Sequence, residues 1–100
     1  MIVVRNVFRL KFGKMKEATA LWKEGREIMK RLGITGGAAR VMTDLAAPFY
    51  TMVIENEFAS AGEWESESRR AMQESEWQNW YQKFVPLCES GYREIFTVVE

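Results

Sequence analysis

The order in which two hydrophobic spacings follow one another along the chain constrains its fold more than any other feature. Alternating apolar residues predict β-strands over 2–11 and 49–58, with weaker strand patterns over 38–45 and 92–100. Apolar residues at three- and four-residue steps predict a helix from Met15 to Leu32. The same spacing predicts a second helical region in two stretches, over 60–74 and 76–85. The chain therefore runs strand, helix, strand, strand, helical region, strand.

This order of elements leaves few possible sheets. Because connections are short and crossovers are right-handed, the common solution is an antiparallel four-stranded sheet of order 4-1-3-2 with both helices on one face. A length of 100 residues is also close to the commonest size of one domain. We therefore expect a single α+β domain of the ferredoxin-like βαββαβ type that covers residues 1–100.

Local signals mark the ends of the helices. Gly33 follows the last apolar residue of the first helix, where a left-handed glycine commonly closes a helix. Ser60 and Glu63 form a capping-box pattern, in which hydroxyl and carboxylate both accept backbone N–H groups near the first turn. Pro86 is expected to end the second helical region.

Charge and the N-terminal sequence argue against nucleic acid and membrane partners. Fourteen Lys and Arg residues balance fourteen Asp and Glu residues, so no net positive field attracts polyanions. The chain meets Arg5 after only a short apolar stretch, without the apolar core of a signal peptide. We expect a cytoplasmic protein that binds neither partner.

Histidine is absent and Cys88 is the only cysteine, which removes several classes of site. Histidine-ligated haem, histidine-rich metal sites and Ser-His-Asp or Cys-His catalysis all need residues that the chain lacks. No carboxylate cluster has the spacing of a cation-binding loop. No basic neighbour is expected to activate the Cys88 thiol. The sequence therefore predicts no cofactor and no metal.

The two faces of the expected sheet differ in character. The apolar residues that should face the helices are Ile2, Val4, Phe8, Leu10, Tyr50, Met52, Ile54 and Phe58. The opposite face should hold Val3, Val7, Met42 and Val53 beside the charged residues Arg5, Arg9, Arg40, Glu55 and Glu57. Such a face is too apolar for comfortable exposure to water and too charged for a dry core. Packing against a second copy would cover it, so we expect a homodimer.

The chain also resembles a known family. The resemblance is carried by RLKFGKMKEATALWKEGREIM after the opening strand, by VIENEFAS, and above all by ESEWQNWYQKFVPLCESGYREIFTVVE. With these segments the sequence resembles the dimeric α/β-barrel superfamily and, within it, the NIPSNAP-like branch. The resemblance implies a homodimeric barrel with a pocket, between sheet and helices or between subunits, where relatives bind small aromatic or hydrophobic molecules. The histidine of haem-binding members is missing, and no residue matches a catalytic motif of the monooxygenase members.

The candidate ligand-binding residues fall into three groups, namely Arg5, Arg9, Glu55 and Glu57, then Trp77, Trp80 and Tyr81, and finally Tyr50. The charged group is either an anion site with a carboxylate base or a set of cross-strand ion pairs that fix the register. The helical aromatic residues either wall an apolar pocket or pack the core. Tyr50, like Asn56, either contacts a ligand between sheet and helices or is a satisfied structural group.

Three functions are compatible with these residues. The leading hypothesis is a small homodimer that binds a small hydrophobic or aromatic molecule in a pocket of the barrel. An alternative is a cofactor-independent monooxygenase acting on an aromatic or polyketide-like substrate, with Glu55 or Glu57 as base and Arg5 or Arg9 stabilising the anion. A second alternative is a purely structural or regulatory dimer.

Overall fold

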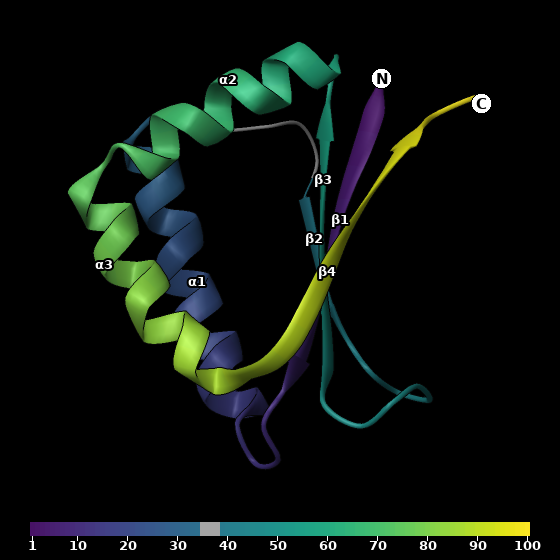
Figure 1. Ribbon diagram of the computed structural model, residues 1–100, viewed down its shortest axis with the longest axis vertical. Coiled ribbons are helices and arrows are strands. Elements are labelled where there is room, and N and C mark those ends of the chain that lie inside the picture. Colours follow the sequence, from purple (N-terminus) through teal and green to yellow (C-terminus); the bar gives the residue numbers. More distant parts are fainter. Residues whose placement is uncertain (35–38) are drawn as a thin grey trace.

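A computed structural model describes residues 1–34 and 39–100 and confirms a four-stranded antiparallel sheet with helices packed on one face (Figure 1). The elements are β1 (Ile2–Leu10), α1 (Met15–Arg31), β2 (Ala39–Thr43), β3 (Thr51–Phe58), α2 (Ala61–Met72), α3 (Ser75–Phe84), a 3₁₀ turn (Val85–Leu87) and β4 (Cys88–Thr97). The sheet order β2-β3-β1-β4 is the predicted order read from its other edge. The predicted start of the second strand at residue 38 lies outside the described residues.

The third and fourth strands begin at other residues than predicted. Tyr50 does not extend β3, because its φ of 61° places it in a left-handed turn conformation. β4 begins at Cys88 rather than Tyr92, since Cys88 pairs with Leu10 beyond an irregularity in the register. The predicted division of the second helical region into two stretches is confirmed, and the extended backbone of Glu74 separates α2 from α3.

The predicted caps are confirmed. Gly33 has a φ of 69°, and the following N–H of Ile34 donates to the Met29 carbonyl at 2.9 Å, which closes α1. The Glu63 N–H donates to Ser60 Oγ at 3.1 Å, while the Glu63 carboxylate accepts the Ala59 N–H at 2.9 Å. The reciprocal pair fixes where α2 begins.

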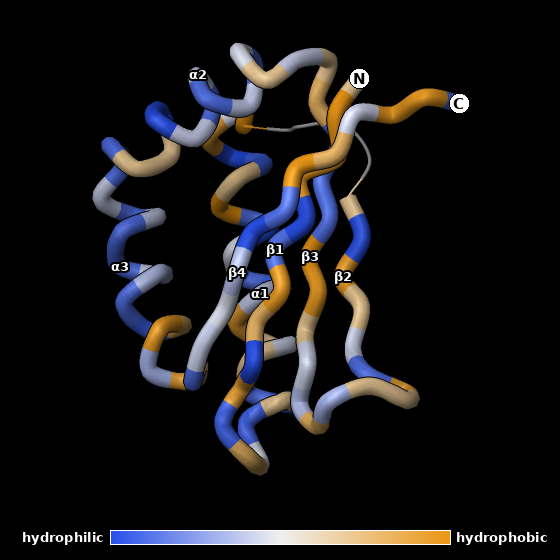
Figure 2. Tube along the Cα trace, turned by 45° about the vertical axis from the view of Figure 1, so that its right-hand side comes forward, coloured by the Kyte–Doolittle hydropathy of each residue, from blue (hydrophilic) through white to orange (hydrophobic). Residues whose placement is uncertain are grey.

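β1 lies between β3 and β4 and pairs with both along most of its length. Because side chains alternate between faces along a strand, its even-numbered residues face the helices and its odd-numbered residues face away. Figure 2 shows the matching alternation of hydropathy along the strands. The register confirms the predicted faces of β1 and β3 and adds Asn6 to the helix-facing side.

Trp80 closes the core between α1 and α3. Its ring is 3% exposed and stacks on Trp77 and Phe84, with centroids 4.6 Å and 5.2 Å away. Its indole N–H donates to the Leu21 carbonyl, which satisfies the one polar atom of the ring. Gly25 lies under this ring, so close that an added Cβ would stand 2.7 Å from Trp80 Cε2. A glycine is needed in α1 because α3 approaches it here.

We expect Gly25→Ala to lower the free energy of unfolding by about 1–3 kcal/mol, because the new methyl group overlaps the Trp80 ring. The matched control is Gly62→Ala in α2, where the nearest atom to an added Cβ is Ser60 Oγ at 3.8 Å. Helix propensity predicts that this control keeps or raises stability by up to about 1 kcal/mol. Urea unfolding followed by circular dichroism measures both; equal stability of Gly25→Ala and the wild-type chain would contradict the close approach.

Candidate functional site

The helix-facing side of the sheet divides into an apolar half and a polar half. Under α1 and α3 it carries Phe8, Leu10 and Met52, which belong to the main core. Toward the other end Asn6 lies in direct register with Arg93 of β4, and Asn56 follows on β3 opposite Val4. Polar side chains on the covered face of a sheet need partners. The polar half therefore contains the candidate site.

Arg93 joins three elements at the polar half. Its Nε–H donates to Asn6 Oδ1 at 2.7 Å, and its guanidinium carbon lies 5.3 Å from the centroid of the Trp64 ring on α2. The hydrogen bond and the cation–π contact together orient the guanidinium between the sheet and α2. Arg93 is exposed, so a small molecule can reach it from solvent.

Glu67 of α2 lies about one helical turn from Trp64. Glu67 follows Trp64 by three residues, a spacing that brings two side chains to neighbouring positions on a helix. Its Oε2 is buried and has no hydrogen-bond partner among the described residues. A buried acceptor without a partner calls for an explanation, and a bound ligand supplies one. We call Asn6, Trp64, Glu67 and Arg93 the helix-side cluster.

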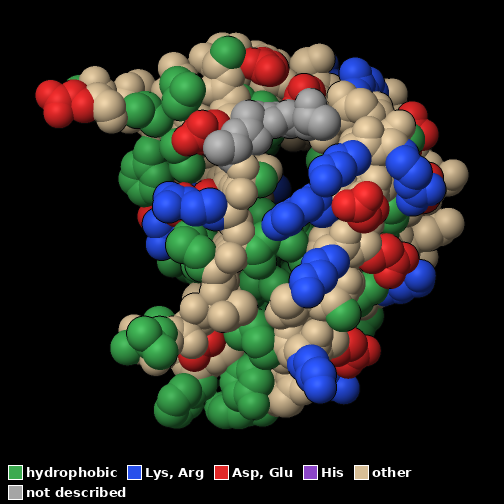
Figure 3. Space-filling view, turned by 180° about the vertical axis from the view of Figure 1, so that it is seen from behind, with side chains coloured by type: hydrophobic (Ala, Val, Ile, Leu, Met, Phe, Trp, Pro, Cys, Tyr) green, Lys and Arg blue, Asp and Glu red, His purple; other side chains and the backbone are tan. Residues whose placement is uncertain are grey.

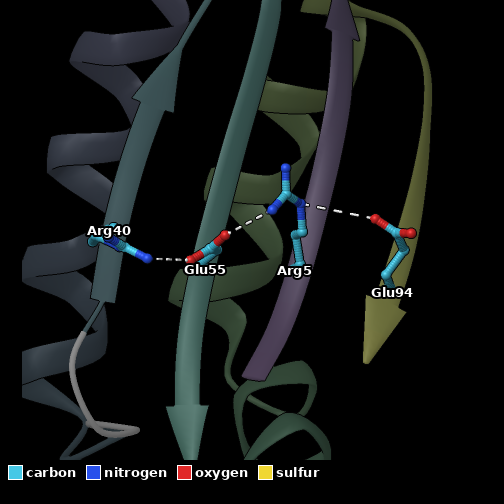
Figure 4. A network of polar contacts seen from close by, with 4 residues as sticks. All are labelled: Arg5, Arg40, Glu55 and Glu94. Atoms are coloured by element: carbon cyan, nitrogen blue, oxygen red, sulfur yellow. Dashed lines mark hydrogen bonds and ion pairs between the residues drawn. The ribbon is translucent and has the colours of Figure 1, made fainter. Parts of the chain in front are cut away.

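Of the predicted charged group, Arg5 and Glu55 meet on the opposite face of the sheet (Figure 4). Arg5 Nη1 donates to Glu55 Oε2 at 3.1 Å, and Arg40 Nη2 donates to Glu55 Oε1 at 2.9 Å. Glu94 Oε1 lies 3.8 Å from Arg5 Nε on the other side. Both oxygens of Glu55, whose side chain is 13% exposed, are thus engaged by arginines. The geometry favours cross-strand ion pairing over a free catalytic base.

Arg9 and Glu57 are not brought together. Arg9 lies opposite Thr51 and Glu57 opposite Val3, at different ends of the same face. The predicted charged group is therefore divided: Arg5 and Glu55 are cross-strand neighbours, whereas the antiparallel register places Arg9 and Glu57 apart. The Nε of Arg9 is buried without a hydrogen-bond partner in the described part of the chain.

The predicted aromatic residues of α3 lie mainly in the core. Trp80 is buried, and Trp77 is half-buried and stacks on it. Tyr81 is exposed on the outer side of the helix. Their arrangement favours the packing interpretation of this group over a ligand wall.

Tyr50 lies in the turn before β3, with its ring 5.2 Å from that of Phe12 in an edge-to-face contact. A shallow pocket of about 140 Å³ opens beside it. Asp44 also lines this pocket, but its Oδ1 accepts the Thr51 N–H, which holds the hairpin. Tyr50 is thus remote from the helix-side cluster, whereas Asn56 lies on the helix-facing side as expected.

The structure defines the environment of Cys88 and limits two further classes of site. Burial raises the pKa of the Cys88 thiol, and Lys11, a neighbour that sequence spacing did not indicate, partly lowers the pKa again. Over residues 1–34 and 39–100, no three acidic or cysteine side chains group in a way that would hold a metal ion. No helix in these ranges has the length and apolar run needed to cross a bilayer.

Sequence reasoning missed all residues of the helix-side cluster as site residues, namely Asn6, Trp64, Glu67 and Arg93. A signal for Asn6 was present, since it is the polar break in the apolar alternation of β1, as Asn56 is in β3. The facing of β4 could not be read from its sequence, so Arg93 was not assigned to a face. Glu67 resembled the other charged residues of α2, and only the helix orientation distinguishes it.

Comparison with known proteins gives the fold. No protein-family model and no curated protein matches the chain. A NIPSNAP family protein from Agrobacterium tumefaciens superposes with a TM-score of 0.89 and 20% identity over 99% of this chain and 86% of that one. An uncharacterized NIPSNAP domain protein from Burkholderia xenovorans gives 0.84 and 17% over 99% and 95%. SnoaB, a cofactor-independent oxygenase from Streptomyces nogalater, gives 0.75 and 12% over 99% and 93%. The chain therefore has a NIPSNAP-like, ferredoxin-like fold. Sequence identities this low do not assign an activity of these proteins to this chain.

We expect Cys88 to react slowly with iodoacetamide at neutral pH, because a raised pKa leaves less thiolate, the reactive form. The pH at which alkylation reaches half its maximal rate should be higher in the folded protein than in the urea-unfolded chain. Lys11→Gln should shift this midpoint further upward, since it removes the charge that lowers the pKa. Coinciding profiles for the folded and unfolded chains would refute the burial effect.

Proposed function

We propose that this protein is a homodimer that binds a small aromatic molecule bearing an anionic or carbonyl oxygen at the helix-side cluster. The observation that carries the proposal is the guanidinium of Arg93, held at 2.7 Å by Asn6 and against the ring of Trp64. A fixed cation beside an aromatic wall recognises an oxygen and a ring at the same time.

The donors of Arg93 support recognition of an oxygen. A guanidinium carries five N–H groups, and only the Nε–H is used in a hydrogen bond within the described residues. Asn6 therefore orients the group while its terminal N–H groups remain available. A carboxylate or phenolate can accept two of them in a forked geometry.

The surroundings of Arg93 support an apolar body for the ligand. Ile95 follows two residues later on the same face of β4 and is 44% exposed although it faces the helices. Val4 lies in register beside Ile95, and Trp64 stands on the opposite side on α2. Apolar walls with a few convergent polar groups are typical of small-molecule sites.

The helix-free face supports the homodimer. Tyr92 and Phe96 lie on it with 61% and 51% of their surface exposed. Figure 3 shows hydrophobic side chains gathered on the sheet side of the molecule and on the hairpin between β2 and β3, while many Lys and Arg side chains lie over the helices. Exposed apolar area of this kind marks an interaction surface.

The ligand test is a thermal-shift and calorimetry panel of aromatic acids, polyketide-like phenols, fatty acids and haem. An aromatic acid or phenol should bind, and Arg93→Gln should weaken it about 10- to 100-fold, because a charge-assisted hydrogen bond contributes about 1.5–3 kcal/mol. Arg26→Gln, at an exposed position of α1, is the matched control and should bind as the wild type does.

Two outcomes of this panel would contradict the binding site. Equal affinities of the Arg93→Gln variant and the wild type would show that the ligand does not bind at the helix-side cluster. Failure of every compound to bind would favour a purely structural or regulatory dimer.

A second candidate function is a cofactor-independent oxygenase, and the buried, partnerless Oε2 of Glu67 favours it. SnoaB, which has this fold, is such an oxygenase. Glu67 would take the proton of a bound phenol or anthrone, and Arg93 would stabilise the resulting anion, which then reacts with molecular oxygen. Glu55 does not suit the role of base, because two arginines engage its carboxylate.

Oxygen uptake on an anthrone or quinol substrate tests this chemistry. Glu67→Gln should lower the rate about 10²- to 10⁴-fold, the range expected for loss of a general base. Glu65→Gln, two residues away and exposed on α2, is the control and should leave the rate unchanged. Substrate binding without oxygen uptake in the wild type would leave ligand binding as the function and exclude the oxygenase.

A further inference from the structure

The pocket beside Tyr50 lies apart from the helix-side cluster and combines a carboxylate with aromatic side chains. It has a volume of about 140 Å³ and is lined by Met15, Thr43, Asp44, Phe49 and Tyr50. Thr43 lies in register with Met52, a buried helix-facing residue, so the pocket belongs to the helix side of the sheet. Figure 1 shows the start of α1 and the hairpin between β2 and β3 at the same end of the molecule. We call this site the hairpin pocket.

The carboxylate of the hairpin pocket is fixed in place but not neutralised. Asp44 Oδ1 accepts the Thr51 N–H at 3.0 Å, and this is the one hydrogen bond that the Asp44 side chain accepts among the described residues. No Lys or Arg side chain in the described ranges forms an ion pair with Asp44. A carboxylate has about four lone-pair sites, so Oδ2 can accept a charge-assisted hydrogen bond from a cation.

The other lining side chains also suit a cation that carries an apolar chain. Phe49 and Tyr50 contribute aromatic rings, and a ring attracts a cation that lies over its face within about 6 Å. Met15 contributes a thioether, which is apolar and polarizable. Phe49 is 68% exposed, so a ligand can reach the hairpin pocket from solvent.

The backbone of Tyr50 is held in an uncommon conformation at the hairpin pocket. With a φ of 61°, Tyr50 is the one non-glycine residue of positive φ in the described part of the chain. The Leu10 N–H donates to the Tyr50 carbonyl at 2.8 Å, and the Phe12 ring packs on the Tyr50 ring. Conformations this sparsely populated persist only where the surrounding structure holds them, and they cluster at functional sites.

We propose that the hairpin pocket binds a primary alkylammonium group. Its ammonium donates hydrogen bonds to Asp44 Oδ2 and to the Thr43 hydroxyl, and its alkyl chain lies against Phe49 and Tyr50. The volume limits the ligand, because sites that enclose a whole drug-sized molecule usually measure about 300–1,000 Å³. A pocket of about 140 Å³ therefore takes a short chain, either a free amine or the end of a lysine side chain.

Two positive features near the hairpin pocket oppose a cation, and both are weaker than the carboxylate. α1 begins at Met15, so the positive end of its dipole lies at the pocket. A helix terminus is equivalent to about half an elementary charge, whereas the Asp44 carboxylate carries a full negative charge. Lys14 precedes α1, but Glu17 lies 3.6 Å from its ammonium and partly offsets that charge. The balance therefore favours a cation over an anion.

The test titrates the protein with butylammonium, 1-butanol and butyrate, which share a chain and differ in charge, while amide NMR spectra are recorded. Butylammonium, added to about 20 mM to reach the weak affinities of so small a ligand, should shift the amide signals of Asp44, Tyr50 and Thr51. It should bind about tenfold or more tightly than butanol or butyrate, because only the ammonium forms a charge-assisted hydrogen bond. A parallel titration uses N-acetyl-lysine methylamide. Binding of both amines admits a protein side chain as the ligand, whereas binding of butylammonium alone assigns the pocket to free amines.

Two variants and a control locate the binding. Asp44→Asn keeps an oxygen for the Thr51 N–H but removes the charge, so it should weaken butylammonium binding about tenfold or more. Phe49→Leu keeps an apolar side chain without a ring, so it should weaken the binding of butylammonium and leave that of butanol unchanged. Glu89→Gln is the matched control, since it removes the same charge from an exposed position at the start of β4, and it should bind as the wild type does.

Three results would overturn the ammonium site: no shift with butylammonium, butyrate binding as tightly as butylammonium, or an unchanged affinity in Asp44→Asn. Phe49→Leu keeps the test valid if Asp44→Asn loosens the hairpin, because Phe49 is exposed and its ring is not part of the core. Sedimentation equilibrium of the same samples separates this site from the homodimer proposed above. The mass should be twice 11.7 kDa with and without butylammonium, and the mass of a single chain would contradict the homodimer alone.

Discussion

The position of β1 in the middle of the sheet is the constraint on which the other features depend. Hydrogen-bonded on both sides, the strand has no freedom to rotate, so the parity of each residue decides the face on which it lies. Arg5 and Asn6 are neighbours in the chain, yet Arg5 pairs with Glu55 on the helix-free face and Asn6 joins the helix-side cluster. The two proposed interactions of the protein, with its second copy and with a ligand, therefore share one rigid strand.

The division of the helix-facing side explains how so small a domain can hold polar groups beneath its helices. In the core around Phe8, Leu10 and Trp80, apolar side chains pack α1 and α3 against the sheet. The other half does not need to hold α1 and α3 to the sheet. Asn6 and Arg93 can therefore lie under α2 without being fully enclosed. Stability and recognition are thus separated along the length of the same strands.

Much of the architecture was predictable because it rests on periodicity and on local signals. The alternation in β1 and β3, the cap at Gly33 and the Ser60–Glu63 pair gave the sheet order and the helix limits. The site was less predictable, because it depends on long-range register. The pairing of Arg5 with Glu55 followed from adjacency of the strands, but Arg9 and Glu57 needed the register itself. Arg93 needed the facing of β4, and Glu67 needed the orientation of α2, which no local pattern determines.

The contact of Trp80 with Gly25 has a consequence for how chains of this kind can diverge. A larger residue at position 25 requires a smaller ring at position 80, and a phenylalanine there would lack the N–H that the Leu21 carbonyl accepts. That carbonyl would keep its helical bond from the Gly25 N–H and lose its second donor. We therefore expect substitutions at Gly25 and Trp80 to occur together during evolution, because a change at either position alone disturbs the contact between α1 and α3.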